Sequence, residues 1–238
     1  MDIVYLLKES EKIEELTISL RSLVHLPHDK IFFVGGFPSD IDPNKIYHIP
    51  VEQNLKTKYK NTTHSLKIVS NTPEISDSFI LMNDDFFIME DIKDPVKELN
   101  LHRGLVDAVY ADYEKRYDGV ITPYAEGMMS TKDLLRGMGY VNPLSYELHI
   151  PIVMHKKNLQ SMFNIPGLDA LPVLHKRTLY GNLFLSNSEY TEDVKMDMHH
   201  PDLPKNTKFL STSDMFFRRF KPFLFNIFDK PSEYELCS

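Results

Sequence analysis

The chain lacks a long apolar run, carries one cysteine and has no excess of basic residues. No apolar run reaches the roughly 18–20 residues that a membrane-spanning helix needs. The first residues, MDIVYLLKES, contain neither a basic segment nor an apolar segment of signal-peptide length. The single cysteine, Cys237, cannot form an internal disulfide, which agrees with a reducing compartment. From these absences we expect a soluble, cytoplasmic protein.

Basic residues are fewer than acidic ones. The 27 lysines and arginines and 34 aspartates and glutamates give a net charge of −7, which is unlike the basic field of a general nucleic-acid-binding protein. Short basic clusters do occur, and on an acidic chain they indicate either phosphate-binding places or solvated surface. They lie at Lys56, Lys58 and Lys60, and at 156–157, 175–177 and 218–221.

Composition and pattern predict one α/β domain over residues 1–238. Hydrophobic residues make up 42% of the chain, as in globular proteins with a core, and no repeat or linker interrupts it. Apolar runs rich in β-formers alternate with helical spacing, which is typical of a largely parallel sheet. Strands are expected at 2–7, 30–36, 45–51 and 78–82. Helices are expected at 11–26, capped by Ser10, and from Asn61 or Thr62.

The second half is less regular. Residues 95–145 are more polar, with partial helices and glycine and proline breaks. The segment 146–163 begins extended and is expected to become helical after Pro151. Residues 175–185 fit a helix or an extended segment, and the chain closes with an aromatic-rich helix.

Two adjacent aspartates, Asp84 and Asp85, interrupt the apolar stretch SFILMNDDFF. An unpaired carboxylate in an apolar core costs several kcal/mol or is protonated, so these side chains need a partner. If the chain turns here, both carboxylates can approach one Mg²⁺ or Mn²⁺ ion, for which hard oxygen ligands are suited. Ligands of open α/β sheets bind outside the carboxyl ends of the strands, where this motif lies. The alternative is a surface turn or helix cap.

His149 and Arg177 are further candidates. Imidazole titrates near neutral pH, so His149 could serve as a general base for a hydroxyl nucleophile. Arginine keeps its proton, which suits Arg177 to clamping a phosphate or diphosphate. Each could equally be an ordinary core or surface residue.

Five parts of the sequence carry a resemblance to a known family: EELTISLRSLVHLP (14–27), FILMNDDFF (79–87), LHIPIVMHKKNLQSMF (148–163), HKRTLYGNLF (175–184) and KFLSTSDMFF (208–217) with FLFNIFDKPSEYE (223–235). Taken in order, they resemble the Stealth-type sugar-phosphotransferases, a family that includes bacterial capsule-polymerising enzymes and the phosphotransferase that tags lysosomal enzymes. The resemblance covers almost the whole chain, although Ser213 stands where the fourth region of the family usually has asparagine and the first region matches only in part.

The resemblance implies a GT-A-like nucleotide-binding core and the transfer of a sugar 1-phosphate from a UDP-sugar to a hydroxyl, with release of UMP. It implies a nucleotide-binding half at 1–95 and an acceptor-side half at 96–238. The matching positions are Asp84 and Asp85 for Mg²⁺ or Mn²⁺ and diphosphate, His149 as acid/base, Arg177 for phosphate, and Asp214, which would complete the metal site or orient His149. We assign further donor contacts to Asn83, Lys58, Lys60 and Arg21.

Two rivals stay open. A GT-A glycosyltransferase would use the same metal and donor but transfer the sugar alone and release UDP. An inactive binding module of the same fold would have no need to keep charged side chains in apolar surroundings. The acceptor fits a glycan or a polyol phosphate, and a protein or a nucleic-acid base is the alternative. The acidic charge balance argues against a nucleic-acid acceptor, although the basic clusters leave room for one.

Overall fold

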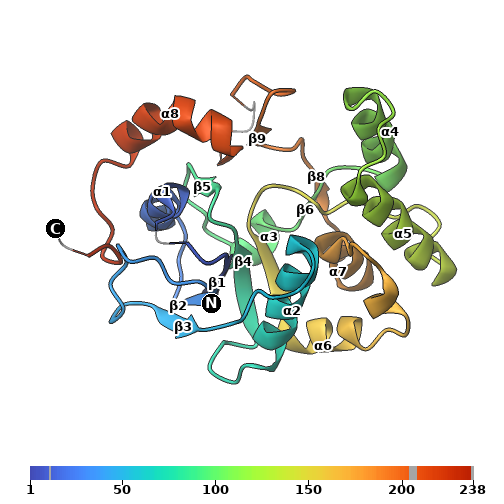
Figure 1. Cartoon of the computed structure of the whole chain (residues 1–238), viewed down its shortest axis with the longest axis horizontal. Coiled ribbons are helices and arrows are strands. Elements are labelled where there is room, and N and C mark those ends of the chain that lie inside the picture. The colour runs from blue at the N-terminus through green and yellow to red at the C-terminus, as the bar shows by residue number, and fades with distance from the viewer. Residues whose placement is uncertain (11, 204–207, 237–238) are drawn as a thin grey trace.

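A five-stranded sheet forms the centre of the computed structural model, which describes residues 1–10, 12–203 and 208–236 (Figure 1). Cys237 lies outside the described residues. The strand order is β3-β2-β1-β4-β7; the first four strands run parallel, and β7 pairs antiparallel with β4. The strands are β1 (Asp2–Leu7), β2 (Ile31–Gly35), β3 (Tyr47–Ile49), β4 (Ser78–Met82) and β7 (Ile152–His155). The predicted α/β fold with a mostly parallel sheet is confirmed.

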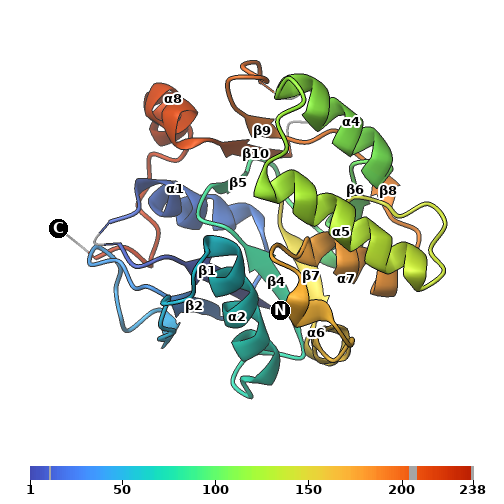
Figure 2. The ribbon, with the colours of Figure 1, turned by 45° about the vertical axis from the view of Figure 1, so that its right-hand side comes forward.

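Both faces of this sheet are buried, which explains why its strands are almost continuously apolar. Side chains alternate along β1: Ile3 and Tyr5 pack against the face covered by α1, and Val4 packs against the opposite face. That opposite face is covered by three helices (Figure 2). The helices are α1 (Glu14–Ser22) on one face and α2 (Lys58–Asn71), α6 (Lys156–Phe163) and α7 (Lys176–Phe184) on the other.

Two helix starts differ from the sequence-based expectation. Ser10 does not cap α1, which begins at Glu14; its hydroxyl instead donates to the Lys12 carbonyl at 2.8 Å. Helix α2 begins at Lys58 rather than Asn61, because the Thr57 hydroxyl accepts the Lys60 N–H at 3.2 Å and caps the helix earlier.

The second half supplies helices and short strands around the central sheet. After Pro151 the chain forms β7 before it becomes helical, and residues 176–184 are helical. The remaining elements outside the central sheet and the second sheet described below are η1 (Leu23–His25), α3 (Pro95–Glu98), β6 (Leu101–His102), α4 (Val106–Arg116), α5 (Pro123–Gly137), η2 (Leu168–Ala170), β8 (Glu189–Tyr190) and α8 (Asp214–Ile227).

A second sheet lies beyond the end of β4. It has the order β5-β10-β9, with β5 (Phe86–Ile88) antiparallel to β10 (Phe209–Thr212) and β9 (Lys195–Met196) parallel to β10. Two serines of α1 hold β5 in place: the Ser19 hydroxyl donates to the Phe86 carbonyl at 2.7 Å, and the Ser22 hydroxyl accepts the Ile88 N–H at 3.1 Å. The SLRS segment therefore fixes the strand that follows Asp84 and Asp85.

Arg21, which we expected to contact the donor, instead joins α1 to the C-terminal segment. Its Nε and Nη2 donate to the Glu235 carboxylate at 2.8 and 2.6 Å, and its Nη1 donates to the Phe228 carbonyl at 2.9 Å. Both partners of the ion pair are largely buried, with side-chain exposures of 11% and 16%. These contacts hold the guanidinium against residues 228–235, and its contact with the donor remains a prediction.

Replacing Arg21 by alanine should lower the free energy of unfolding by about 2–3 kcal/mol, because Glu235 would keep a largely buried charge without its cation. Urea unfolding measures the change. Lys45→Ala is the matched control, since Lys45 forms an exposed pair with Glu233 that should matter little. Equal losses in the two variants would contradict a structural role for Arg21.

Candidate functional site

Asp84 and Asp85 lie in a tight turn between β4 and β5, at the carboxyl edge of the central sheet. The turn is closed by the Phe86 N–H, which donates to the Asn83 carbonyl at 3.3 Å. Asn83 is exposed, and the two aspartates are partly buried. Of the two arrangements the sequence allowed, the chain therefore turns at this point rather than continuing as a strand.

Asp85 has partners in two strands of the second sheet, β9 and β10. Its Oδ2 accepts from Lys195 Nζ at 3.0 Å and from the Ser211 hydroxyl at 3.1 Å. Asp84 has less compensation: burial raises its pKa to about 6, and the negative charge of Asp85 adds to the shift. Asp84 is therefore the carboxylate that gains most from an added cation.

Two more carboxylates share the negative field of this turn. Burial raises the pKa of Glu15, at the start of α1, and the charges of Asp214 and Asp85 raise it further. Asp214 is exposed and is the first residue of α8. We use the name acidic cluster for Glu15, Asp84, Asp85 and Asp214.

The acidic cluster fits a hard divalent cation that is completed by a ligand. Within the described ranges, no three His, Cys, Asp or Glu side chains are arranged to hold a metal ion by themselves. Mg²⁺ is commonly held by only one or two carboxylates together with substrate phosphates and water. The uncompensated charge of Asp84 beside Asp85 meets that requirement, so these two residues suit Mg²⁺ or Mn²⁺.

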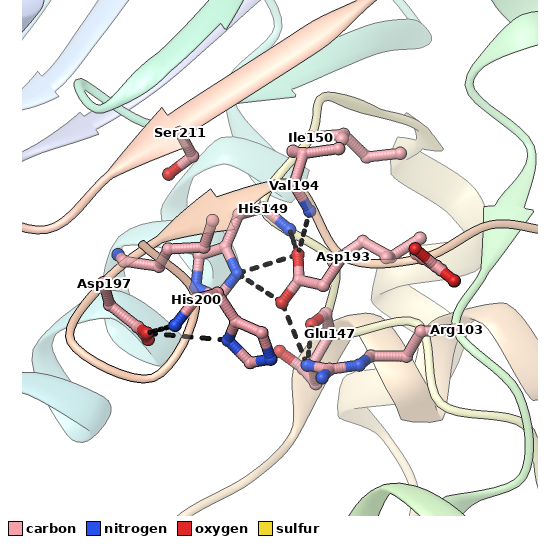
Figure 3. Close-up of polar contacts among 12 residues, drawn as sticks. Arg103, Glu147, His149, Ile150, Asp193, Val194, Asp197, His200 and Ser211 are labelled. Carbon is pink, nitrogen blue, oxygen red and sulfur yellow. Dashed lines mark hydrogen bonds and ion pairs between the residues drawn. The ribbon is translucent and has the colours of Figure 1, made fainter. Parts of the chain in front are cut away.

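His149 is held by Asp193, a residue that the sequence analysis missed (Figure 3). The His149 Nδ1 lies 2.9 and 3.1 Å from the two carboxylate oxygens of Asp193, and its backbone N–H donates to the same group at 3.0 Å. Arg103 Nη1 donates to Asp193 at 3.1 Å. Burial by itself would raise the pKa of Asp193, but the charges and hydrogen bonds of His149 and Arg103 hold it well below its usual range.

This arrangement determines the tautomer of His149. An ionised carboxylate only accepts hydrogen bonds, so the Nδ1 that faces Asp193 must carry a proton. In the neutral ring Nε2 is then the free acceptor, which is the state that a general base requires. The His149 side chain keeps 31% of its surface exposed, so this imidazole remains accessible.

Arg177 acts on the segment that carries His149. Its two Nη groups donate to the Leu148 and Ile150 carbonyls, on either side of His149. Burial lowers the pKa of Arg177 to about 10, which leaves it charged at neutral pH, and the negative charge of Glu147 opposes the shift. Its contacts are those of a residue that positions His149; a phosphate contact remains a prediction.

Phe86 connects the two parts of the site. The edge of the His149 ring meets the Phe86 ring at a centroid distance of 6.3 Å, and the Arg177 guanidinium lies 5.5 Å from the centre of the same ring. Phe86 directly follows Asp85. Phe86 thus follows the paired aspartates along the chain, and its ring contacts both His149 and Arg177.

Lys58 and Lys60 lie elsewhere. Both are exposed in the first turn of α2. Lys60 borders a hollow of about 230 Å³ between α2 and η2, together with His64 and Lys67. The structure does not bring these lysines to the acidic turn, so their contact with the donor remains a prediction.

A larger hollow, of about 630 Å³, opens at the carboxyl ends of β1, β2 and β3. Its lining includes Glu9, Phe37, His48 and the Gly35–Gly36 pair. Both glycines are required by close packing, since a Cβ on Gly35 would lie 2.2 Å from the Leu7 carbonyl oxygen and one on Gly36 would lie 2.3 Å from that of Lys8. This is the edge at which open α/β sheets bind ligands.

Sequence reasoning also missed Glu15, Arg103 and Lys195. Glu15 belongs to an amphipathic helix, where an acidic residue in the first turn has an ordinary role beside the helix dipole. Asp193 lies just before the two-residue strand β9 and Lys195 is its first residue, in a polar segment that has no periodic pattern. Only the fold brings these residues to the site, so the sequence contains no local signal for them.

Replacing Asp84 by asparagine should raise the free energy of unfolding of the metal-free protein by about 2–3 kcal/mol at pH 8. The substitution removes a buried negative charge that destabilises the folded state. The folded pKa is raised above the unfolded value, so the cost is present above about pH 6 and disappears as the pH falls toward 4. The gain should shrink over that range.

Urea unfolding in EDTA at several pH values measures this gain. Asp133→Asn, at an exposed position of α5, is the matched control and should give no such trend. A gain that is absent at pH 8, or that does not vary with pH, would contradict the burial of an uncompensated charge at Asp84.

Comparison with solved structures shows the fold. The chain is similar to the galactosyltransferase LgtC in complex with donor and acceptor sugar analogues, with a TM-score of 0.56 and 8% sequence identity over 99% of this chain and 98% of that one. The match to the bifunctional glycosyltransferase WbbM covers 97% of this chain and 44% of the WbbM chain, with 13% sequence identity and a TM-score of 0.49. The match to mouse xyloside xylosyltransferase 1 covers 90% of this chain and 99% of that one, with 9% sequence identity and a TM-score of 0.47.

No protein-family model matches the chain. No curated protein matches it either. The resemblance to Stealth-type phosphotransferases therefore remains a prediction. What the likeness to LgtC establishes is the architecture: the chain has the GT-A-like α/β fold found in glycosyltransferases.

Proposed function

We propose that the protein is a nucleotide-sugar-dependent glycosyltransferase that uses a divalent cation. The observation that carries the proposal is the His149–Asp193 pair, because its imidazole contacts Phe86, the residue that directly follows the paired carboxylates Asp84 and Asp85. A general base and an acidic pair suited to a cation are the two parts that such a transfer needs. The GT-A-like fold supports a nucleotide-sugar donor, and we expect UDP as the nucleotide.

Each part has a defined task. A divalent ion at Asp84 and Asp85 would hold the donor diphosphate and stabilise the negative charge that develops on the leaving group. The hollow beside Gly35 and Gly36, which adjoins the first turn after β1, would take the nucleoside, because its volume suits a small ligand. Lys195, which already contacts Asp85, adds positive charge to the same place.

The transfer step follows from the state of His149. Its free Nε2 takes the proton of an acceptor hydroxyl while the oxygen forms a bond to the anomeric carbon of the sugar. The bond between that carbon and the diphosphate oxygen breaks, and UDP leaves with the bonding electrons. Asp193 stabilises the imidazolium that forms, and Arg177 keeps the segment 148–150 in place. A base-assisted direct displacement of this kind inverts the anomeric configuration.

A second candidate is the transfer of a sugar 1-phosphate with release of UMP. It is favoured by the way the segments that resemble Stealth-type enzymes come together: the SLRS segment holds β5, and FILMNDDFF meets the segments of His149 and Arg177 at Phe86. The same base would then activate a hydroxyl for attack at the sugar-linked phosphorus, and the bond from that phosphorus to the UMP oxygen would break. The acceptor in either case is a hydroxyl, which we assign to a glycan or a polyol phosphate.

Product analysis tests both candidates. The purified protein with Mn²⁺ or Mg²⁺, a panel of UDP-sugars and hydroxyl acceptors should release UDP, and the release should stop in EDTA. His149→Ala should lower kcat by about 10²–10⁴-fold, because it removes the general base. Asp85→Ala should abolish the dependence on metal together with most of the activity.

The exposed residues His64 and Asp133 supply matched controls, His64→Ala and Asp133→Ala, which should retain activity. Release of UMP with the same dependence on metal and on His149 would replace glycosyl transfer by sugar-phosphate transfer. Activity that survives in Asp85→Ala and His149→Ala would refute the proposed site for both reactions.

A further inference from the structure

Helix α8 has two different faces. Its inner face packs Phe216, Phe217 and Leu224 into a separate aromatic core with Phe87 of β5. Its outer face carries apolar side chains that the fold leaves in solvent: Met215, Phe223 and Ile227 are 57%, 42% and 41% exposed. Since the inner face already supplies the packing, the outer apolar residues are not needed to hold the helix in place.

The outer face is also basic. Arg218 and Arg219 are both exposed and lie between Met215 and Phe223 along the helix. Among the described residues neither arginine has an ion-pair partner, in contrast to Lys221, which pairs with Glu14. Asp214 and Asp229 lie at the two ends of the helix, and Glu14 is neutralised by its pair with Lys221. On a chain with a net charge of −7, this is a local positive surface.

The helical spacing aligns these residues. Met215, Arg219, Phe223 and Ile227 follow one another at intervals of four, so they form one line along the exposed side of α8. Figure 1 shows α8 along the outer edge of the molecule, beyond α1. Val24, which is 78% exposed, extends the apolar surface, because it lines the same hollow of about 480 Å³ as Ile227.

We propose that this outer face of α8, with Met215, Arg218, Arg219, Phe223 and Ile227, binds the surface of a membrane that contains anionic lipids. Large apolar side chains interleaved with arginines on one exposed helix face are the signature of a helix that lies in the lipid–water interface. The arginines meet the lipid phosphates, and the apolar side chains enter the headgroup boundary. In the described part of the chain no helix is both long and apolar enough to cross a membrane, so such binding would be peripheral.

Charge decides between a membrane and a purely apolar partner. Two unpaired arginines at the centre of the face favour an anionic surface, whereas a second copy of this face would bring four arginines together. Because α8 begins at Asp214 of the acidic cluster, a membrane bound along it would lie beside the candidate site. The proposal itself does not depend on the transferase reaction, since lipid binding requires neither donor nor acceptor.

Vesicle sedimentation tests the proposal with the full chain. The protein should bind vesicles of phosphatidylcholine with phosphatidylglycerol, bind much less to phosphatidylcholine alone, and dissociate as salt is raised. The double variant Arg218→Gln with Arg219→Gln should lower the partition coefficient about 30-fold. Phe223→Ser should also weaken binding, and this loss should persist at low salt.

The matched control removes two positive charges from other exposed positions, Lys115→Gln with Lys157→Gln, and should bind as the unchanged protein does. Failure of the unchanged protein to bind anionic vesicles would overturn the proposal. So would equal losses in the control and the arginine variant. Sedimentation velocity without lipid tests whether a second copy of the chain binds this face. A dimer that is dissociated by Phe223→Ser would show self-association and overturn the proposal.

Discussion

The candidate site depends on one partly buried carboxylate. Asp193 accepts the backbone N–H groups of His149 and Val194, the Nδ1–H of the His149 ring and an N–H of Arg103. A carboxylate that receives this many donors stays ionised and can only accept, so it sets both the position and the tautomer of the imidazole. Arg177 reinforces the constraint from the other side by binding the carbonyls of Leu148 and Ile150.

The turn that carries Asp84 and Asp85 differs from Asp193, because the charge of Asp84 is poorly compensated. The negative charges of Asp85 and Glu15 oppose the ionisation of Asp84, and of the two aspartates only Asp85 has close cationic and hydroxyl partners. A carboxylate whose pKa is raised in this way is a candidate functional group. Phe86 links the acidic turn to His149, because it follows Asp85 directly and its ring contacts the His149 ring. The two parts of the site therefore differ: His149 has its hydrogen-bond partner, Asp193, within the protein, whereas Asp84 and Asp85 are suited to a cation.

The sequence predicted the central fold well because its strands are buried on both faces and are therefore apolar throughout. Strands at 2–7 and 78–82 match β1 and β4 residue for residue, and the turn after β4 holds the aspartates that the apolar context singled out. Arg21 shows the limit of this reasoning: it stands in a segment of the resemblance, yet its partner, Glu235, is 214 residues away. Asp193 and Lys195 gave no signal, because a strand of only two residues in a polar segment has the sequence pattern of a loop.

The state of the His149 ring tests the central claim most directly. Nitrogen-15 NMR of the histidine side chains at alkaline pH, with His149→Gln to assign the signal, reports which ring nitrogen carries the proton. We predict a proton on Nδ1 and a free Nε2 in the unchanged protein, and a loss of that preference in Asp193→Ala. A neutral ring protonated on Nε2 in the unchanged protein would contradict the account, because His149 could not then accept a proton from a hydroxyl at that nitrogen.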